Sequence, residues 1–149
     1  MSPPERLIGG EFSCQFGGES YAITNTGRSS LRLILESISV QEKKVLLPNF
    51  LCETICDVFK EFNVETTFYE VSEEFEASLE SFQQENTILY VIRYFGANWG
   101  FVDWAVRNWD TTLIIDDTFG IFQGPIKRRA PYYYFNSLRK IAPVNGLSQ

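Results

Sequence analysis

Apolar runs of strand length alternate with segments of helical spacing along this chain, and that alternation constrains the fold more than any other feature. Leu31, Ile34, Leu35 and Ile38 recur at the spacing of one helix face, and the apolar run 44–47 follows them. The predicted strands are 44–47, 66–71, 87–92, 112–116 and 132–135, and the predicted helices are 28–38, 51–62, 73–82 and 100–109. A parallel crossover needs a connection of helical length. The pattern therefore predicts an α/β fold, a three-layer, mostly parallel sheet with helices on both faces.

Length and composition favour one domain behind a short leading segment. The chain has 149 residues, of which 44% are hydrophobic, and this is enough for a single globular domain with a real core. Pro3, Pro4 and two pairs of glycines punctuate the start of the chain. Residues 1–20 are therefore predicted to form an N-terminal arm, and residues 21–149 the domain.

Charge and residue types disfavour several classes of function. The chain has 19 acidic and 13 basic residues, and its net charge of -6 has the wrong sign for a nonspecific nucleic-acid binder. It has no histidine, which excludes Ser-His-Asp triads and imidazole zinc sites, so no metal is expected. Three cysteines suggest a reducing compartment, and Cys52 and Cys56 are interpreted as small core residues. No signal peptide or membrane span is visible, and a cytoplasmic location is predicted.

Polar residues follow the predicted strands, at the edge where a parallel sheet places its ligands. Asp116 and Asp117 end one apolar run, and Ser137 and Lys140 follow the aromatic run 132–135. A carboxylate can pair with a protonated ring nitrogen, and a lysine amine can form a Schiff base with an aldehyde, as pyridoxal phosphate requires. Asp117 is predicted to pair with the ring nitrogen, and Lys140 is predicted to form the Schiff base with the aldehyde. Asp116 is predicted to face the other side of the strand.

Each of these residues also has an ordinary interpretation. Asp117 could be a helix cap or a solvated turn residue, and Lys140 could be a solvated surface charge. The place of Lys140 after the run 132–135 favours the functional interpretation, because desolvation by the aromatic rings and the nearby cation Arg139 would favour the neutral amine. The basic run 127–129 is interpreted as a solvated loop.

The segment 26–30, Thr-Gly-Arg-Ser-Ser, opens the first predicted helix. A helix start offers unpaired N–H groups and a partial positive charge, Gly27 allows close approach of the backbone, and the hydroxyls of Thr26 and Ser29 add donors for a phosphate. An ordinary N-cap is the alternative. Neither the dinucleotide glycine pattern nor the P-loop pattern is present.

Five segments resemble, in order and approximate spacing, the large domain of the DegT-like aminotransferases, which are fold-type I pyridoxal-phosphate enzymes. They are Thr-Gly-Arg-Ser-Ser-Leu at 26–31, Val-Leu-Leu-Pro at 45–48, Tyr-Phe-Gly at 94–96, Ile-Ile-Asp-Asp at 114–117 and Ser-Leu-Arg-Lys at 137–140. The resemblance covers roughly residues 21–146. It implies that the cofactor phosphate is held by Gly27, Arg28, Ser29 and Ser137. It also implies that Asp117 binds the ring nitrogen and that Lys140 forms the aldimine.

The sequence departs from this family in three ways. The aromatic residue that usually stacks on the cofactor ring is replaced near Cys52. Gly120 stands three positions after Asp117, where the family commonly has His or Gln. The chain also ends nine residues after Lys140, whereas the family continues through the rest of the large domain and a small C-terminal domain. The expectation is an incomplete fold-type I large domain without the small domain. Lysine at position 140 favours the aminotransferase branch over the related sugar dehydratases.

The function that the resemblance implies is amino transfer from an amino donor to a keto-sugar, which in many members is attached to a nucleotide. Members usually build each site at a homodimer interface, so a homodimer is expected. Two alternatives stay open. One is a noncatalytic truncated domain that acts in binding or assembly, and the other is an unrelated α/β domain that binds a small anion.

Overall fold

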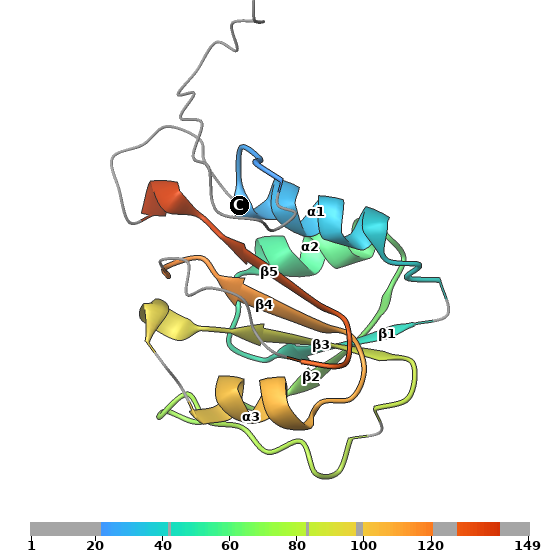
Figure 1. Cartoon of the computed structure of the whole chain (residues 1–149), viewed down its shortest axis with the longest axis vertical. Helices are drawn as coiled ribbons and strands as arrows, with labels where there is room; N and C mark the ends of the chain where they lie inside the picture. Colours follow the sequence, from blue (N-terminus) through green and yellow to red (C-terminus); the bar gives the residue numbers. More distant parts are fainter. Residues whose placement is uncertain (1–21, 42, 83, 98–99, 121–127, 141–149) are drawn as a thin grey trace, which may run out of the picture.

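Five strands of the described residues form one parallel sheet (Figure 1). This computed structural model describes residues 22–41, 43–82, 84–97, 100–120 and 128–140. The strands are β1 (Lys44–Pro48), β2 (Glu65–Tyr69), β3 (Thr87–Ile92), β4 (Leu113–Asp117) and β5 (Tyr132–Asn136), in the order β2-β1-β3-β4-β5. Each neighbouring pair is parallel, which confirms the predicted sheet.

Helices cover both faces of the sheet, which confirms the three layers (Figure 1). The described helices are α1 (Gly27–Ser37), α2 (Glu53–Glu61) and α3 (Gly100–Asn108), with short 3-10 turns η1 (Tyr94–Gly96) and η2 (Leu138–Lys140). The apolar side chains of α1 and α2 pack on one face, and those of α3 pack on the other. The sheet is therefore buried between two layers of helix.

Burial on both faces explains why the central strands are continuous apolar runs. In β1, Val45 and Leu47 belong to the core under α1 and α2, whereas Leu46 belongs to the core under α3. In β4, Ile114 and Ile115 divide between the two cores in the same way. The alternation along each strand thus decides which polar side chains at the strand end share a face.

The predicted helix 73–82 is wrong, because the described part of this segment is irregular with turns. Phe75 has a φ of 60°, in the left-handed region that interrupts a right-handed helix. The Ser72 hydroxyl oxygen accepts a hydrogen bond of 3.1 Å from the backbone N–H of Glu74, which gives the backbone an alternative to helical bonding. The apolar spacing still indicates burial correctly at Leu79, which is 3% exposed.

Arg128 holds the carboxyl end of α3, so the solvated-loop interpretation of this residue is wrong. Its guanidinium group donates hydrogen bonds to the carbonyl oxygens of Ala105 at 3.1 Å, of Ala130 at 3.2 Å, and of Trp109. The Ala105 carbonyl also accepts a hydrogen bond of 3.0 Å from the backbone N–H of Trp109. Arg128 therefore adds a donor at the last turn of α3 and supplies one to the Trp109 carbonyl just beyond the helix.

The variant Arg128→Ala is expected to lower the free energy of unfolding by about 1–3 kcal/mol, because it removes the hydrogen bonds that the guanidinium group donates to carbonyl oxygens at and just beyond the end of α3. Urea denaturation measures the loss. Arg129→Ala is the matched control, since Arg129 is exposed and its removal should change stability by less than about 0.5 kcal/mol. Equal losses in the two variants would contradict this role of Arg128.

Two predictions fall on residues outside the described ranges. These are the N-terminal arm 1–20 and the position of Lys127 in the basic run. Among the helices that the structure does describe, none combines the length and the apolar character needed to cross a bilayer.

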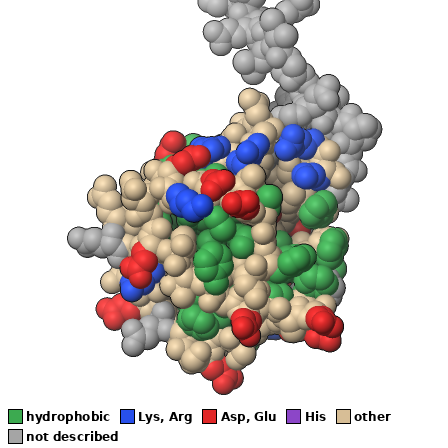
Figure 2. Space-filling view, turned by 180° about the vertical axis from the view of Figure 1, so that it is seen from behind, with side chains coloured by type: hydrophobic (Ala, Val, Ile, Leu, Met, Phe, Trp, Pro, Cys, Tyr) green, Lys and Arg blue, Asp and Glu red, His purple; other side chains and the backbone are tan. Residues whose placement is uncertain are grey.

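The face turned away from the viewer of Figure 1 carries side chains of both charges (Figure 2). Basic side chains gather in its upper part, acidic ones lie among them and along the lower margin, and hydrophobic ones fill the space between.

Candidate functional site

The carboxyl ends of β3, β4 and β5 lie at one edge of the sheet (Figure 1). Asp117, the last residue of β4, is in register with Asn136, the last residue of β5. The start of α1 lies over the same edge. A Cβ atom built on Gly27 would be 3.3 Å from the Phe135 ring and 3.8 Å from the Thr118 hydroxyl oxygen. The structure thus brings the helix start together with the ends of two neighbouring strands.

Asp116 and Asp117 point to opposite faces of the sheet, as the strand period predicts. Asp116 accepts a hydrogen bond of 2.6 Å from the Tyr90 hydroxyl, on the face that α1 and α2 cover. Burial raises the pKa of the Asp116 carboxyl above its usual value, against the opposing effect of its hydrogen bonds to Thr118 and Tyr90. Asp117 lies on the side of α3, where Tyr134 also packs.

The Asp117 carboxylate is fully buried and is held by groups from both neighbouring strands. Arg93, directly after β3, is 5% exposed and places its Nη1 3.2 Å from Oδ2 of Asp117. Tyr134 of β5 donates a hydrogen bond of 2.6 Å to the same oxygen. Burial, with the hydrogen bond to Asp117 adding to it, raises the pKa of Tyr134 above its usual value, so the hydroxyl remains a donor. Within the described residues, Oδ1 of Asp117 has no hydrogen-bond partner.

Arg93 comes directly after the predicted strand 87–92, but no pattern in the sequence gives it a partner. An arginine directly after a buried strand, at the same sheet edge as a buried carboxylate, is the signal that could have found the pair. Neither charge is stable alone in an apolar interior. Tyr134 gives no such signal, since the surrounding run 132–135 is aromatic throughout.

Gly120 packs directly on the Asp117 carboxyl group. The Gly120 N–H donates a hydrogen bond of 2.8 Å to the Asp117 carbonyl oxygen, which closes a turn after β4. A Cβ atom built on Gly120 would lie 2.0 Å from Cγ and from each carboxylate oxygen of Asp117. Real Cβ contacts are essentially never this short. The absence of a side chain at position 120 therefore gives the Asp117 carboxylate the space that it occupies.

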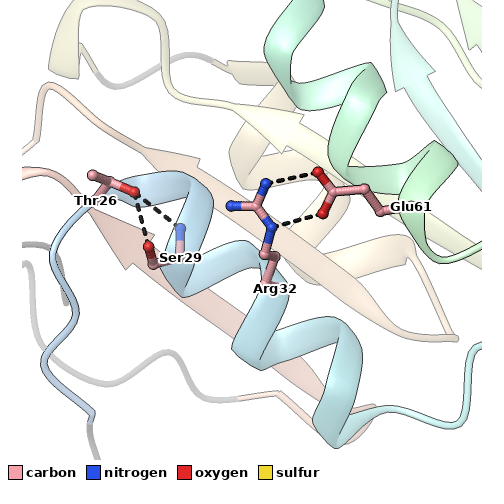
Figure 3. A network of polar contacts seen from close by, with 4 residues as sticks. All are labelled: Thr26, Ser29, Arg32 and Glu61. Atoms are coloured by element: carbon pink, nitrogen blue, oxygen red, sulfur yellow. Dashed lines mark hydrogen bonds and ion pairs between the residues drawn. The ribbon is translucent and has the colours of Figure 1, made fainter.

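Thr26 caps α1, as the ordinary interpretation of this segment predicts (Figure 3). Its Oγ1 accepts a hydrogen bond of 3.1 Å from the backbone N–H of Ser29 and lies 3.0 Å from the Ser29 hydroxyl oxygen. A cap of this kind satisfies one N–H group of a helix start and leaves others for an anion. Nearby, Arg32 and Glu61 form a two-point ion pair at 2.7 Å, which joins α1 to α2 (Figure 3).

Ser137 and Lys140 differ in burial. Ser137 is 2% exposed, and its Oγ has no hydrogen-bond partner among the residues that the structure describes. Lys140 is exposed at the end of η2, and its Nζ lies 5.9 Å from the centroid of the Phe119 ring. The run 132–135 therefore does not desolvate Lys140 as predicted, because η2 carries the amine away from β5 and over the segment that follows β4.

Cys52 lies at the start of α2 and is exposed, so its interpretation as a core residue is wrong. A hydrogen bond with the Thr54 hydroxyl at 3.1 Å lowers the pKa of the Cys52 thiol, and the positive charges of Lys140 and Arg28 lower that pKa further. Helix α1 contacts both α2 and β5, so these elements share one region of the molecule.

Exposed aromatic rings border this region. Phe95 and Phe119 are 66% and 44% exposed, and their ring centroids are 6.4 Å apart. Phe75 lies 5.4 Å from Phe95 and 4.9 Å from Tyr94, again between ring centroids. The rings follow different strands and form a continuous apolar surface that reaches the amine of Lys140. Surfaces of this kind suit flat ligands that combine an apolar body with polar groups.

No family model and no curated protein matches the sequence. Solved structures do match the fold. Substrate-bound BacF from Bacillus subtilis aligns with a TM-score of 0.64 at 14% identity, over 85% of this chain and 39% of BacF. The synthase of 3-amino-5-hydroxybenzoic acid aligns with a TM-score of 0.65 at 12% identity, over 85% of this chain and 36% of the synthase.

A third match names an activity. Spr1654 from Streptococcus pneumoniae, a candidate sugar aminotransferase in its PMP form, aligns with a TM-score of 0.58 at 14% identity, over 85% of this chain and 39% of Spr1654. The chain shares the fold of part of these proteins. It spans less than two fifths of the length of these three proteins. The predicted fold, an incomplete fold-type I transferase large domain, is confirmed.

Proposed function

We propose that this chain is the cofactor-binding part of a pyridoxal-phosphate-dependent aminotransferase. The observation that carries the proposal is a convergence at the carboxyl edge of an aminotransferase fold. The last residue of β4 carries a buried carboxylate, a buried serine hydroxyl follows β5, and the start of α1 lies near the ends of these two strands. An exposed lysine amine lies over the Phe119 ring, which follows β4. Ligands of open α/β sheets bind at this edge.

The buried polar atoms fit this cofactor. Oδ1 of Asp117 and Oγ of Ser137 are both buried and have no hydrogen-bond partner in the described part of the chain. A ring N–H would donate a hydrogen bond to Oδ1 of Asp117, and a phosphate oxygen would accept one from the Ser137 hydroxyl. In this assignment Gly27, Arg28, Ser29 and Ser137 hold the phosphate, and Asp117 holds the ring nitrogen. Gly27 allows the close approach of the backbone that a phosphate at a helix start requires.

Lys140 is assigned to the aldehyde. Bound pyridoxal phosphate supplies an electron sink through which an amino group is taken from a donor and passed on. Lys140 would hold the aldehyde carbon through Nζ and, once displaced, would move the proton at the α-carbon of the amino donor. Phe119, whose ring lies under Nζ, would keep the amine beside the site.

The acceptor is assigned to the keto-sugars, including those attached to nucleotides. The resemblance of the sequence to the DegT-like family supports this class, and so does the match to Spr1654. A homodimer is assigned on the same family grounds. An edge strand supports self-association as well, since β2 lies at the rim of the sheet and exposes 48% of Phe68.

A noncatalytic domain that acts in binding or assembly is the second candidate. The observation in its favour is that Lys140, the residue assigned to the aldehyde, is exposed, whereas the Asp117 carboxylate is fully buried. The two candidates differ in turnover and agree on the architecture of the site.

Reductive trapping tests the proposed function. The full chain is mixed with pyridoxal phosphate and treated with borohydride, and peptide mass spectrometry locates the label. Lys140 is expected to carry it, and Lys140→Ala is expected to lose it. Lys60→Ala is the matched control, because Lys60 is exposed and pairs with Asp57 at 3.0 Å. Label spread evenly over surface lysines would contradict the proposal, and label at Lys140 without amino transfer would favour the noncatalytic candidate.

A further inference from the structure

Arg93 and Asp117 form an ion pair that is buried on both sides. Their side chains are 6% and 0% exposed, whereas each of the other ion pairs between described residues has both partners at least 38% exposed. Arginine stays protonated in proteins, and a buried cation of this kind requires a counter-charge. The group assigned to the ring nitrogen is therefore already in contact with a permanent cation.

The surrounding contacts fix this pair in one arrangement. Tyr134 donates to the oxygen that Arg93 contacts, Oδ2, and Gly120 packs against the carboxyl group. The backbone N–H of Arg93 donates a hydrogen bond of 2.8 Å to the carbonyl oxygen of Asp116, which ties the start of the loop after β3 to β4. One carboxylate oxygen thus has two donors, and the other has none within the described residues.

The charge of Arg93 changes what Asp117 can do for a bound ring. A negative charge favours a protonated ring nitrogen, and a nearby positive charge opposes it. Among the residues that the structure describes, the titratable groups in contact with Asp117 are the cation Arg93 and the phenol Tyr134, while Asp116 lies on the other face of β4. The pair of Arg93 and Asp117 therefore offers a hydrogen-bond acceptor whose net charge is close to zero.

We propose that Arg93 is a positioning residue for the cofactor. It fixes Asp117 through Oδ2 and leaves Oδ1 as the acceptor of the ring N–H. Its positive charge partly neutralises the carboxylate, so the ring nitrogen is less readily protonated. This inference rests on the proposed function, since it concerns the ring of the same cofactor. Its consequence is that the bound ring loses its proton at a lower pH than it would beside an unpaired aspartate.

The ring proton can be followed directly by nitrogen NMR, which does not depend on turnover. The full chain is loaded with pyridoxal phosphate that carries ¹⁵N in the ring, and the ring-nitrogen shift is recorded against pH. Arg93→Gln is expected to raise the midpoint of this titration by about one to three pH units, because it removes the opposing charge. Arg93→Lys keeps a positive charge and is expected to stay near the wild-type midpoint. An unchanged midpoint in Arg93→Gln would overturn the inference.

Two further variants complete this test, one as a substitute if Arg93→Gln does not fold and one as a control. Tyr134→Phe removes a neutral donor from Oδ2, folds more readily than a variant with an unpaired buried charge, and is expected to raise the midpoint by less than Arg93→Gln does. A fall or no change in that variant overturns the inference where Arg93→Gln does not fold. Arg32→Gln is the matched control, since it removes an arginine from an exposed ion pair between α1 and α2 and should leave the midpoint unchanged.

If the proposed function is wrong, the NMR experiment gives a different result. In that case no variant, the wild type included, gives a signal from bound pyridoxal phosphate. Urea unfolding of the chain without cofactor then tests the part of the inference that needs no cofactor, namely that Arg93 fixes Asp117. The losses caused by Arg93→Gln and Asp117→Asn are expected to be strongly non-additive in a double-mutant cycle, because the two side chains are in contact. Additive losses would overturn the positioning role itself.

Discussion

Replacing Asp117 by alanine is expected to lower the free energy of unfolding by about 3–5 kcal/mol. The variant leaves the Arg93 guanidinium group buried without a counter-charge, and it removes the acceptor of the Tyr134 hydroxyl. Urea denaturation followed by tryptophan fluorescence measures the loss. This single side chain thus ties β4 to the loop after β3 and to β5, in addition to its proposed role toward a ligand.

Asp57→Ala is the matched control for that measurement. Asp57 forms an ion pair with Lys60, but the two side chains are 55% and 69% exposed. A surface pair of this kind contributes about 0–1 kcal/mol, so the control is expected to stay close to the wild type. An Asp117→Ala variant that is no less stable than Asp57→Ala would contradict the buried pair.

Gly120→Ala is expected to cost about 2–4 kcal/mol, although it adds only one methyl group. The added carbon would lie 2.0 Å from the carboxyl atoms of Asp117, so the carboxylate must move. Movement breaks its contacts with Arg93 and Tyr134, and this loss adds to the ordinary cost of overpacking. Thermal or urea unfolding gives the change in stability, and the affinity for pyridoxal phosphate is expected to fall with it.

Gly100→Ala is the matched control for the glycine variant. Gly100 is exposed at the first position of α3, and a Cβ atom there would meet the flexible end of Glu76 at 3.2 Å. Alanine also favours a helix more than glycine does, so the control should be neutral or slightly stabilising. A Gly120→Ala variant that is as stable as this control would show that the carboxylate is not confined as the structure places it.

The architecture was predictable because strong periodicity and burial agree along most of the chain. All five described strands and the three described helices lie where apolar runs and helical spacing place them. The segment 73–82 fails for a physical reason, since a left-handed residue at Phe75 and hydrogen bonds from the backbone to Ser72 replace the helix. Apolar spacing reports burial there and does not report backbone conformation.

The site was predictable in part. The alternation of strand positions separates Asp116 from Asp117, and the parallel topology brings the end of β4 beside the end of β5. Pairing across strands is invisible in one sequence, which is why Arg93 and Tyr134 were not assigned to Asp117. The exposure of Lys140 depends on the path of η2, which no local pattern specifies. The roles of these residues toward a cofactor stay predictions.

The central claim is that the carboxyl edge of this sheet binds pyridoxal phosphate through Asp117 and the phosphate-binding groups of α1 and Ser137. Equilibrium titration of the full chain with pyridoxal phosphate tests it most directly. The account predicts saturable binding of one molecule per chain, weakened at least about tenfold in Asp117→Asn because the charged acceptor of the ring N–H is lost. No saturable binding by the wild type, or equal affinity in Asp117→Asn, would contradict it.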